Sequence, residues 1–217
     1  MKAMDLALIF DFDGTVANSI EAIFQLINKL APSYGFEPLS QETFNTLRDL
    51  SIPKACRKLH FPLSKLPQAI MTVLNEYRQI MPQLLPCPGM DTVIRKLKEW
   101  GIILGLISSN DAEHINDFLK RNNLDCFDWI EGTRGILGKH NSISTQVKKH
   151  KLNQNHTFYI GDEVRDIKAA HRSKVKIISV TWGLHSEENL LRHHPDYLVR
   201  KPEELLDLVQ NIQSNLL

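Results

Sequence analysis

The stretch ALIFDFDGTV, residues 7–16, places two acids and a glycine directly after a short apolar run. Uninterrupted apolar residues over 6–10 are typical of a parallel strand that is buried on both faces. Asp11 and Asp13 then stand at the carboxyl end of this strand, the edge where open α/β sheets bind their ligands. Carboxylates this close repel each other unless a cation lies between them, and their oxygens suit Mg²⁺. An ordinary Asp-Gly turn after a strand is the simpler alternative.

The composition limits the classes of protein to which the chain can belong. Its 217 residues, 42% of them hydrophobic, can bury one large core or two small ones. A net charge of +1 gives no electrostatic reason to expect binding to nucleic acid or to a membrane surface. The apolar runs are too short to span a bilayer, and no signal peptide is visible. The three cysteines lack metal-ligand spacing and indicate reduced thiols, so the expected location is cytoplasmic.

Residues 16–86 have a purely helical pattern. Apolar residues recur at intervals of three and four in a first helix, at Ile20, Ile23, Phe24, Ile27 and Leu30. Asn18 or Ser19 is expected to cap this helix, and Ala31-Pro32-Ser33 and Tyr34-Gly35 are expected to end it. Further helices are predicted over 41–50, 53–59 and 67–80. The sequence therefore predicts a small all-helical domain at 16–86, inserted into a larger domain of residues 1–15 and 87–217.

From residue 90 onward, helical and strand patterns alternate. Strands are predicted over 102–107, 127–130, 157–160 and 176–180, with a short extended piece at 196–199 and a closing helix from Pro202. Strands that alternate with helices imply right-handed crossovers. The fold class predicted for the larger domain is therefore α/β, with a doubly wound parallel sheet.

Polar groups follow two more of these strands. The segment SSN, residues 108–110, comes directly after the strand 102–107, and Asp162 follows the strand 157–160. Because the carboxyl ends of parallel strands meet at one edge, these groups are expected near the first two acids. Each has a plainer explanation, since Ser-Ser-Asn is a common helix cap and acids suit the start of a helix.

Lys139 lies in the segment LGK, residues 137–139, just before a helix expected over 142–150. A lysine is usually a solvated surface charge, and three more lysines stand within residues 148–151. Lys139 differs from these neighbours because it follows a glycine and stands at a helix start, and it is therefore the lysine that we select as a candidate site residue.

Four motifs in this order resemble those of the haloacid dehalogenase (HAD) superfamily, in particular its phosphoglycolate-phosphatase-like branch. The matching segments are DFDGT at 11–15, Ser108, Lys139 and GDEVRD at 161–166. The resemblance covers essentially the whole chain. It implies a Rossmann-like core with strand order 5-4-1-2-3, the first strand central, and a mobile helical cap at 16–86.

The resemblance also implies a role for each matching residue. Asp11 would be the nucleophile that becomes an aspartyl-phosphate, and Asp13 the general acid and base. Ser108, with the backbone N–H of Ser109, would hold a phosphoryl oxygen. The remaining substrate-binding residues expected in the core are Gly14, Thr15 and Asn110.

The expected Mg²⁺ site comprises the Asp11 carboxylate, the Asp13 backbone carbonyl and Asp162. Lys139 would neutralise the nucleophile and the phosphate, and Asp166 would act through water or orient Lys139. Arg48, in the segment 46–51 between two helices of the predicted cap, is a candidate contact for a carboxylate or second phosphate on the substrate. An exposed arginine on a helix is the plainer interpretation of Arg48.

The activity implied is Mg²⁺-dependent hydrolysis of a small-molecule phosphate monoester, by a monomer or homodimer. Dehalogenases and phosphonatases lack the second acid, so Asp13 excludes them, and P-type ATPases carry a lysine there. A sugar phosphomutase of the β-phosphoglucomutase type keeps every motif residue and remains the alternative enzyme. A non-catalytic binding protein on the same scaffold is the other alternative, although such a protein would be expected to lose Asp11 or Asp13.

Overall fold

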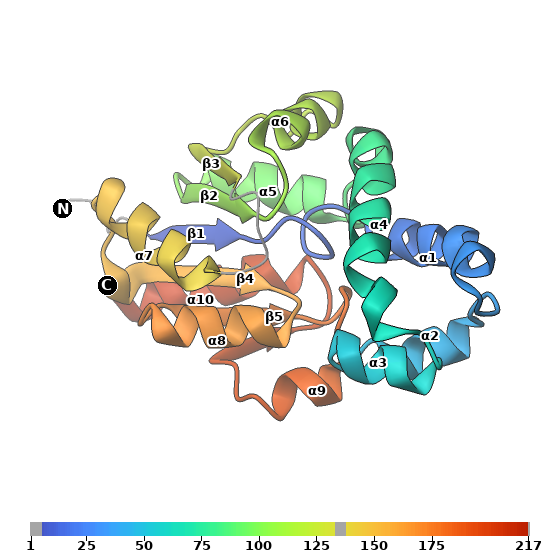
Figure 1. Cartoon of the computed structure of the whole chain (residues 1–217). Coiled ribbons are helices and arrows are strands. Elements are labelled where there is room, and N and C mark those ends of the chain that lie inside the picture. The colour runs from blue at the N-terminus through green and yellow to red at the C-terminus, as the bar shows by residue number, and fades with distance from the viewer. Residues whose placement is uncertain (1–5, 133–137, 217) are drawn as a thin grey trace.

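The computed structural model describes residues 6–132 and 138–216, and its centre is a six-stranded sheet (Figure 1). All neighbouring strands are parallel, in the order β3-β2-β1-β4-β5-β6. The strands are β1 (Ala7–Phe10), β2 (Ile103–Ser108), β3 (Trp129–Gly132), β4 (Thr157–Gly161), β5 (Lys176–Val180) and β6 (Tyr197–Val199). The expected order is confirmed, and the extended piece near residue 197 adds β6 at the edge.

The central strand β1 is buried on both faces. Leu8 and Phe10 belong to one hydrophobic cluster, whereas Ile9, which points to the opposite face, belongs to another. Each of these side chains is fully buried. A strand with an apolar layer on either side has no place for a polar residue, which explains the uninterrupted apolar run before Asp11.

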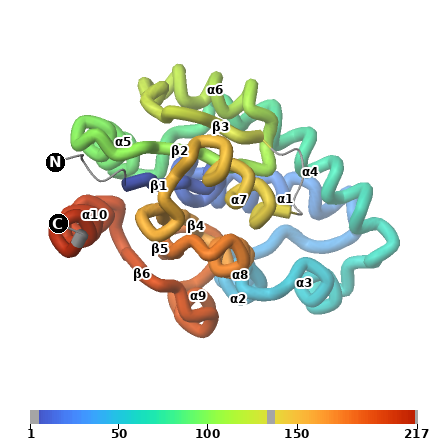
Figure 2. Tube along the Cα trace, turned by 90° about the vertical axis from the view of Figure 1, so that its left-hand side faces the viewer, coloured from blue at the N-terminus to red at the C-terminus, as the bar shows by residue number. Residues whose placement is uncertain are grey.

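Helices form a layer on each face of the sheet. One layer contains α5 (Met90–Glu99), α6 (Ala112–Arg121) and α10 (Glu204–Leu216), and the other α7 (Lys139–Lys149), α8 (Val164–Arg172) and α9 (Glu187–Leu191). In Figure 2 the strand labels run from β3 at the top to β6 at the bottom, with α5 and α10 on one side and α7 and α8 on the other. The predicted doubly wound α/β class is confirmed.

The segment 16–86, called the helical insertion below, lies beyond the carboxyl end of β1 (Figure 1). Its helices are α1 (Ile20–Tyr34), α2 (Gln41–Leu47), α3 (Ile52–Lys58) and α4 (Leu66–Ile80). The part of the chain outside the insertion is called the sheet domain below. The two connections between them run side by side: Asn18 N–H donates to Leu85 O at 3.0 Å, and Cys87 N–H donates to Val16 O at 2.8 Å. The insertion therefore leaves and rejoins the rest of the chain at one place.

Some predicted boundaries were wrong for local physical reasons. Helix α1 does not stop at Ala31-Pro32-Ser33 but continues to Tyr34, and it ends at Gly35, the other predicted stop, whose φ of +79° is left-handed. Proline lacks the N–H that would bond the carbonyl four residues earlier, so its presence costs this helix one hydrogen bond close to its end. Ser19 stands before α1, but its hydroxyl accepts the Gly14 N–H at 3.0 Å and does not cap the helix.

Two other elements are shorter or begin later than expected. Helix α2 ends at Leu47 and not at residue 50. Strand β3 begins at Trp129 because Phe127 packs edge-on against Phe10, and the hydrophobicity of Phe127 therefore serves the core and not a strand. In the parts of the chain that the structure describes, no helix is long and apolar enough to cross a membrane.

Candidate active site

The loop after β1 turns tightly and keeps its two acids at the carboxyl edge of the sheet. Asp11 N–H donates to Ile160 O at 2.8 Å, which extends the pairing of β1 with β4 by one residue. Gly14 has a φ of +68°, a conformation that glycine adopts readily. A side chain at Gly14 would collide with the carboxylate of Asp162, so the loop and the end of β4 are packed against each other.

Three buried carboxylates meet at this edge: Asp11 after β1, Asp162 after β4 and Asp166 in the first turn of α8. One carboxylate oxygen from each lies within 4.8 Å of the other two. All three residues are at most 3% exposed. Burial raises the pKa of the Asp11 and Asp162 carboxyls, and repulsion from neighbouring acids raises it further. The cluster therefore favours a cation.

Lys139 supplies one cation to this cluster. Its helix α7 begins directly after Gly138, which has a φ of +96°, and its Nζ lies 2.6 Å from Asp11 Oδ2 and 2.5 Å from Asp166 Oδ1. Burial alone would lower the pKa of this ammonium, but the two carboxylates raise it well above its ordinary value. Leu137, the first residue of the quoted LGK segment, lies outside the described residues.

A hard divalent cation fits the rest of the donor set. Lys139 balances only one of the three carboxylates, and carboxylate oxygens suit such ions. Two donors orient the Asp162 carboxylate: Thr15 Oγ1 at 3.0 Å and the Leu184 backbone N–H at 2.7 Å. Hydrogen bonds of this kind fix the direction of a metal ligand. Asp11 and Asp162 are the residues that would hold the ion.

Asp13 points away from the three-carboxylate cluster. Its Oδ1 accepts a hydrogen bond from the Tyr77 hydroxyl, and its Oδ2 accepts one from Asn110 Nδ2 at 2.7 Å. Tyr77 belongs to α4 in the helical insertion and is 4% exposed. Burial and the neighbouring Asp13 carboxylate raise the pKa of Tyr77, so this phenol keeps its proton. The Asp13 carboxylate therefore lies between the two parts of the molecule.

The segment after β2 lies at the same edge. The Ser108 hydroxyl accepts the Asn110 N–H at 3.1 Å, and both residues are buried while Ser109 is half-buried. Asn110 reaches Asp13, as described above. Thr15, expected to bind substrate, instead donates its hydroxyl to Asp162 in this structure.

Arg48 is not brought into the carboxylate cluster. It caps the C-terminal end of α2, where its backbone N–H donates to Phe44 O at 2.9 Å. Its side chain makes no hydrogen bond or ion pair with the residues that the structure describes. Its neighbour Asp49 instead accepts hydrogen bonds from Ser186 N at 2.9 Å and Asn189 Nδ2 at 3.2 Å, as well as from the Ser186 hydroxyl. Asp49 thus joins the insertion to the start of α9.

Sequence reasoning missed Tyr77 and Asp49 and assigned no role to Glu163. The structure makes Glu163 the N-cap of α8, where it forms a capping box with Asp166. A Glu with an Asp three residues later is a weak sign of such a box. Tyr77 and Asp49 carry no comparable signal, because their partners lie 64 and 137 or more positions away.

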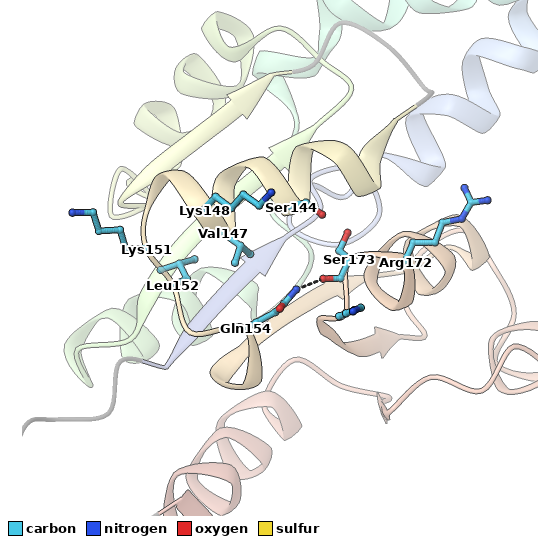
Figure 3. Close-up of a pocket in the computed structure, with 9 residues that line it drawn as sticks. Ser144, Val147, Lys148, Lys151, Leu152, Gln154, Arg172 and Ser173 are labelled. Atoms are coloured by element: carbon cyan, nitrogen blue, oxygen red, sulfur yellow. Dashed lines mark hydrogen bonds between the residues drawn. The ribbon is translucent and has the colours of Figure 1, made fainter.

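A separate shallow hollow lies between α7 and the end of α8 (Figure 3). Four cationic side chains line it, those of Lys148, Lys151, Arg172 and Lys174, and none of its lining residues is acidic. It contains none of the predicted site residues and offers no carboxylate to a metal ion. The groups able to carry out chemistry are therefore gathered at the strand ends.

Comparisons with known proteins agree with this geometry. Residues 8–180 match the family model described as haloacid dehalogenase-like hydrolase. Phosphoglycolate phosphatase of Synechococcus elongatus is 29% identical over 95% of this chain and 98% of its own length. N-acetylmuramic acid 6-phosphate phosphatase of Pseudomonas aeruginosa is 20% identical over 96% of this chain and 97% of its own length.

A solved structure shares the fold. The haloacid dehalogenase-like family hydrolase from Streptococcus pneumoniae superposes with a TM-score of 0.81 at 20% identity, over 95% of this chain and 99% of that one. The chain belongs to the haloacid dehalogenase-like hydrolase family and is a phosphatase-type member similar to the phosphoglycolate phosphatases.

Proposed function

We propose that the protein hydrolyses the phosphate monoester of a small organic molecule through an aspartyl-phosphate on Asp11, with Mg²⁺ in the carboxylate cluster. The observation that carries the proposal is the contact of Asp11 with Lys139 inside a buried cluster that also holds Asp162 and Asp166. The Lys139 ammonium holds the Asp11 carboxylate in place and opposes the rise in its pKa that burial causes, which favours the ionised form that a carboxylate nucleophile requires.

In the first step a carboxylate oxygen of Asp11 forms a bond to phosphorus while the phosphorus–ester oxygen bond breaks. Asp13 gives its proton to the departing oxygen, so that an alcohol and not an alkoxide leaves. In the second step water attacks phosphorus, the bond to Asp11 breaks, and Asp13 takes a proton from the water. The two acids thus divide nucleophilic and proton-transfer work between them.

The other residues at the strand ends would stabilise charge on the transferring group. The Lys139 ammonium and the Ser108 hydroxyl, with the N–H of Ser109, are the donors proposed for the phosphoryl oxygens. Asp11 and Asp162, with the backbone carbonyl of Asp13, would hold Mg²⁺, which neutralises charge on the phosphate when bound. Asp166 would keep Lys139 directed at Asp11, as its 2.5 Å contact with the ammonium suggests.

A phosphoglycolate-like ester is the proposed substrate class. The relative of Synechococcus elongatus that matches nearly the whole chain is named for phosphoglycolate, whereas that of Pseudomonas aeruginosa is named for a sugar acid phosphate. Because the four motifs would act on the phosphoryl group alone, we expect residues outside them to choose the ester. Arg48 is our candidate contact for a carboxylate on the substrate.

The function is tested with Asp11→Asn, assayed with Mg²⁺ on phosphoglycolate and on p-nitrophenyl phosphate. We expect turnover to be abolished on both, because an amide is nearly isosteric with the carboxylate but is a poor nucleophile. Asp128→Asn is the matched control, since that carboxylate lies outside the site, paired with Lys98. Wild-type turnover by Asp11→Asn would refute the mechanism, and a completely inactive wild type would favour the non-catalytic alternative.

A further inference from the structure

The Asp13 carboxylate is held on both of its oxygens. Tyr77 donates its hydroxyl to Oδ1, and Asn110 donates Nδ2–H to Oδ2 at 2.7 Å. The Tyr77 hydroxyl is the donor in its contact, and each carboxyl oxygen has a second site, so Asp13 can accept both hydrogen bonds and still carry a proton. With one donor on each oxygen, rotation of the carboxyl group about its bond to Cβ is restricted.

The two donors come from different parts of the molecule. Asn110 follows β2 in the sheet domain, whereas Tyr77 stands near the C-terminal end of α4 in the helical insertion. Helix α4 packs against α1, and the 3₁₀ turn after it (Met81–Gln83) packs against α6 of the sheet domain. The contact of the Tyr77 hydroxyl with Asp13 therefore depends on how the helical insertion packs against the sheet domain.

We propose that Tyr77 is a positioning residue for the acid–base step, which makes the helical insertion part of the catalytic apparatus as well as a source of selectivity. This inference rests on the proposed function. Tyr77 does not touch the reacting atoms; it holds Asp13 so that the carboxyl group faces the departing oxygen.

The hydrogen bond from Tyr77 gains strength as the reaction proceeds. When the phosphorus–ester oxygen bond breaks, the proton of Asp13 moves to the departing oxygen and Asp13 becomes a carboxylate. Hydrogen bonds to an ionised acceptor are about twice as strong as those to a neutral one. Tyr77 therefore lowers the barrier only to the extent that the departing group needs the proton. An ester with a good leaving group should depend on Tyr77 much less.

The test is Tyr77→Phe, assayed as kcat/KM on an alkyl ester, phosphoglycolate, and on an aryl ester with a good leaving group, p-nitrophenyl phosphate. The ratio kcat/KM covers the steps up to departure of the leaving group and excludes later hydrolysis of the aspartyl-phosphate. We expect a loss of roughly 10- to 100-fold on the alkyl ester, as for a hydrogen bond to a charged group, and a loss below about threefold on the aryl ester.

Tyr34→Phe is the matched control, since the Tyr34 hydroxyl bonds Thr72 at 3.0 Å within the insertion and does not contact Asp13. This control should change neither ratio. A purely structural role of Tyr77 would reduce kcat/KM on both esters alike, and that result, or no loss on either, would overturn the inference. Melting temperatures of both variants show whether the fold is kept.

A second measurement gives the answer even if Tyr77→Phe lowers stability. Here kcat/KM of the wild type, both single variants and the double variant is measured on one further ester, phenyl phosphate. In an Asp13→Asn background, Tyr77→Phe should cause no further loss on this ester, because a residue that acts through Asp13 has nothing left to position. An additional loss of the single-variant size would overturn the proposal. If Asp11→Asn is inactive while Tyr77→Phe behaves like Tyr34→Phe, the positioning role fails and the proposed function stands.

Discussion

Gly14 lies where the loop after β1 meets the carboxylate of Asp162. Replacing it would have two costs in free energy, one from the backbone conformation and one from the collision with Asp162. A side chain at Gly14 would be strained by the φ of +68° and would also collide with Asp162. Gly35, at the end of α1, has a similar φ of +79° but no atom within 4 Å of where a Cβ would be. Gly14→Ala and Gly35→Ala therefore share the backbone cost and differ in the collision.

We expect Gly35→Ala to lower the free energy of unfolding by roughly 1–2 kcal/mol, the cost of a left-handed conformation for a residue with a Cβ. Gly14→Ala should lower it further, because its Cβ would also collide with Asp162. Only Gly14→Ala should also weaken Mg²⁺ binding and reduce kcat/KM, because Asp162 must move. Urea titrations measure the first effect, and Mg²⁺ titrations of activity the second. Equal Mg²⁺ dependence in the two variants would contradict the assignment of Asp162 as a ligand.

The residues that the sequence predicted best are those whose position follows from one strand. Asp11 and Asp162 each come directly after a buried apolar run, so the polarity of the sheet alone brings them together. Tyr77 could not be found this way, because a tyrosine in an amphipathic helix is ordinarily a core residue. Its contact with Asp13 depends on how the insertion packs on the sheet, which no local pattern encodes.

At the scale of elements, the strands were predicted more closely than the ends of the helices. Strand β5 has the predicted bounds, Lys176–Val180, and its last four residues are buried. Helix α1 passes Pro32 at the cost of one hydrogen bond and ends three residues later at Gly35, where the backbone is left-handed. Phe127 resembled a strand residue because hydrophobicity alone does not distinguish core packing from strand pairing.

The junction of α2 and α3 carries two adjacent side chains with different surroundings. Asp49 is tied to Ser186 and Asn189 at the start of α9, and these hydrogen bonds lower its pKa despite partial burial. The Arg48 side chain makes no hydrogen bond or ion pair with the described residues, and it remains our candidate contact for the substrate. The junction therefore combines an attachment of the insertion to the sheet domain with a candidate selectivity residue.

Alanine substitution at each position should separate these two roles. Arg48→Ala should lower kcat/KM for phosphoglycolate by roughly 1.5–3 kcal/mol, as for a charge-assisted contact, and leave the value for p-nitrophenyl phosphate unchanged. Asp49→Ala should lower kcat/KM for both esters alike, because it removes hydrogen bonds that hold the insertion against the sheet domain. It should also speed hydrogen exchange of the Ser186 amide. Equal behaviour of Arg48→Ala on both esters would make Arg48 a surface residue.

For the molecule as a whole, the carboxylate cluster stores an unfavourable charge that a metal ion would relieve. The pKa of Asp162 is raised well above its usual value by burial and then by Glu163, Asp166 and Asp11, so its ionised form is unfavourable in the folded protein. In the unfolded chain these acids separate and are hydrated. At neutral pH the metal-free protein is therefore less stable than its core alone would make it.

Mg²⁺ should accordingly raise the melting temperature of the wild type, because it binds the folded state. At 100 times its dissociation constant the gain is about 2.7 kcal/mol, and for a domain of 150–250 residues this amounts to roughly 5–10 °C. Asp162→Asn should abolish the shift, since a ligand is lost. Without Mg²⁺, however, this variant should melt no lower than the wild type, because the amide removes a buried charge. Asp91→Asn, which alters an exposed carboxylate paired with Arg95, is the control and should keep the full shift.

A Mg²⁺ shift that survives Asp162→Asn would mean that the ion binds elsewhere. A metal-free Asp162→Asn much less stable than the wild type would mean that Asp162 serves the fold through its bonds to Thr15 and Leu184 more than it serves the metal.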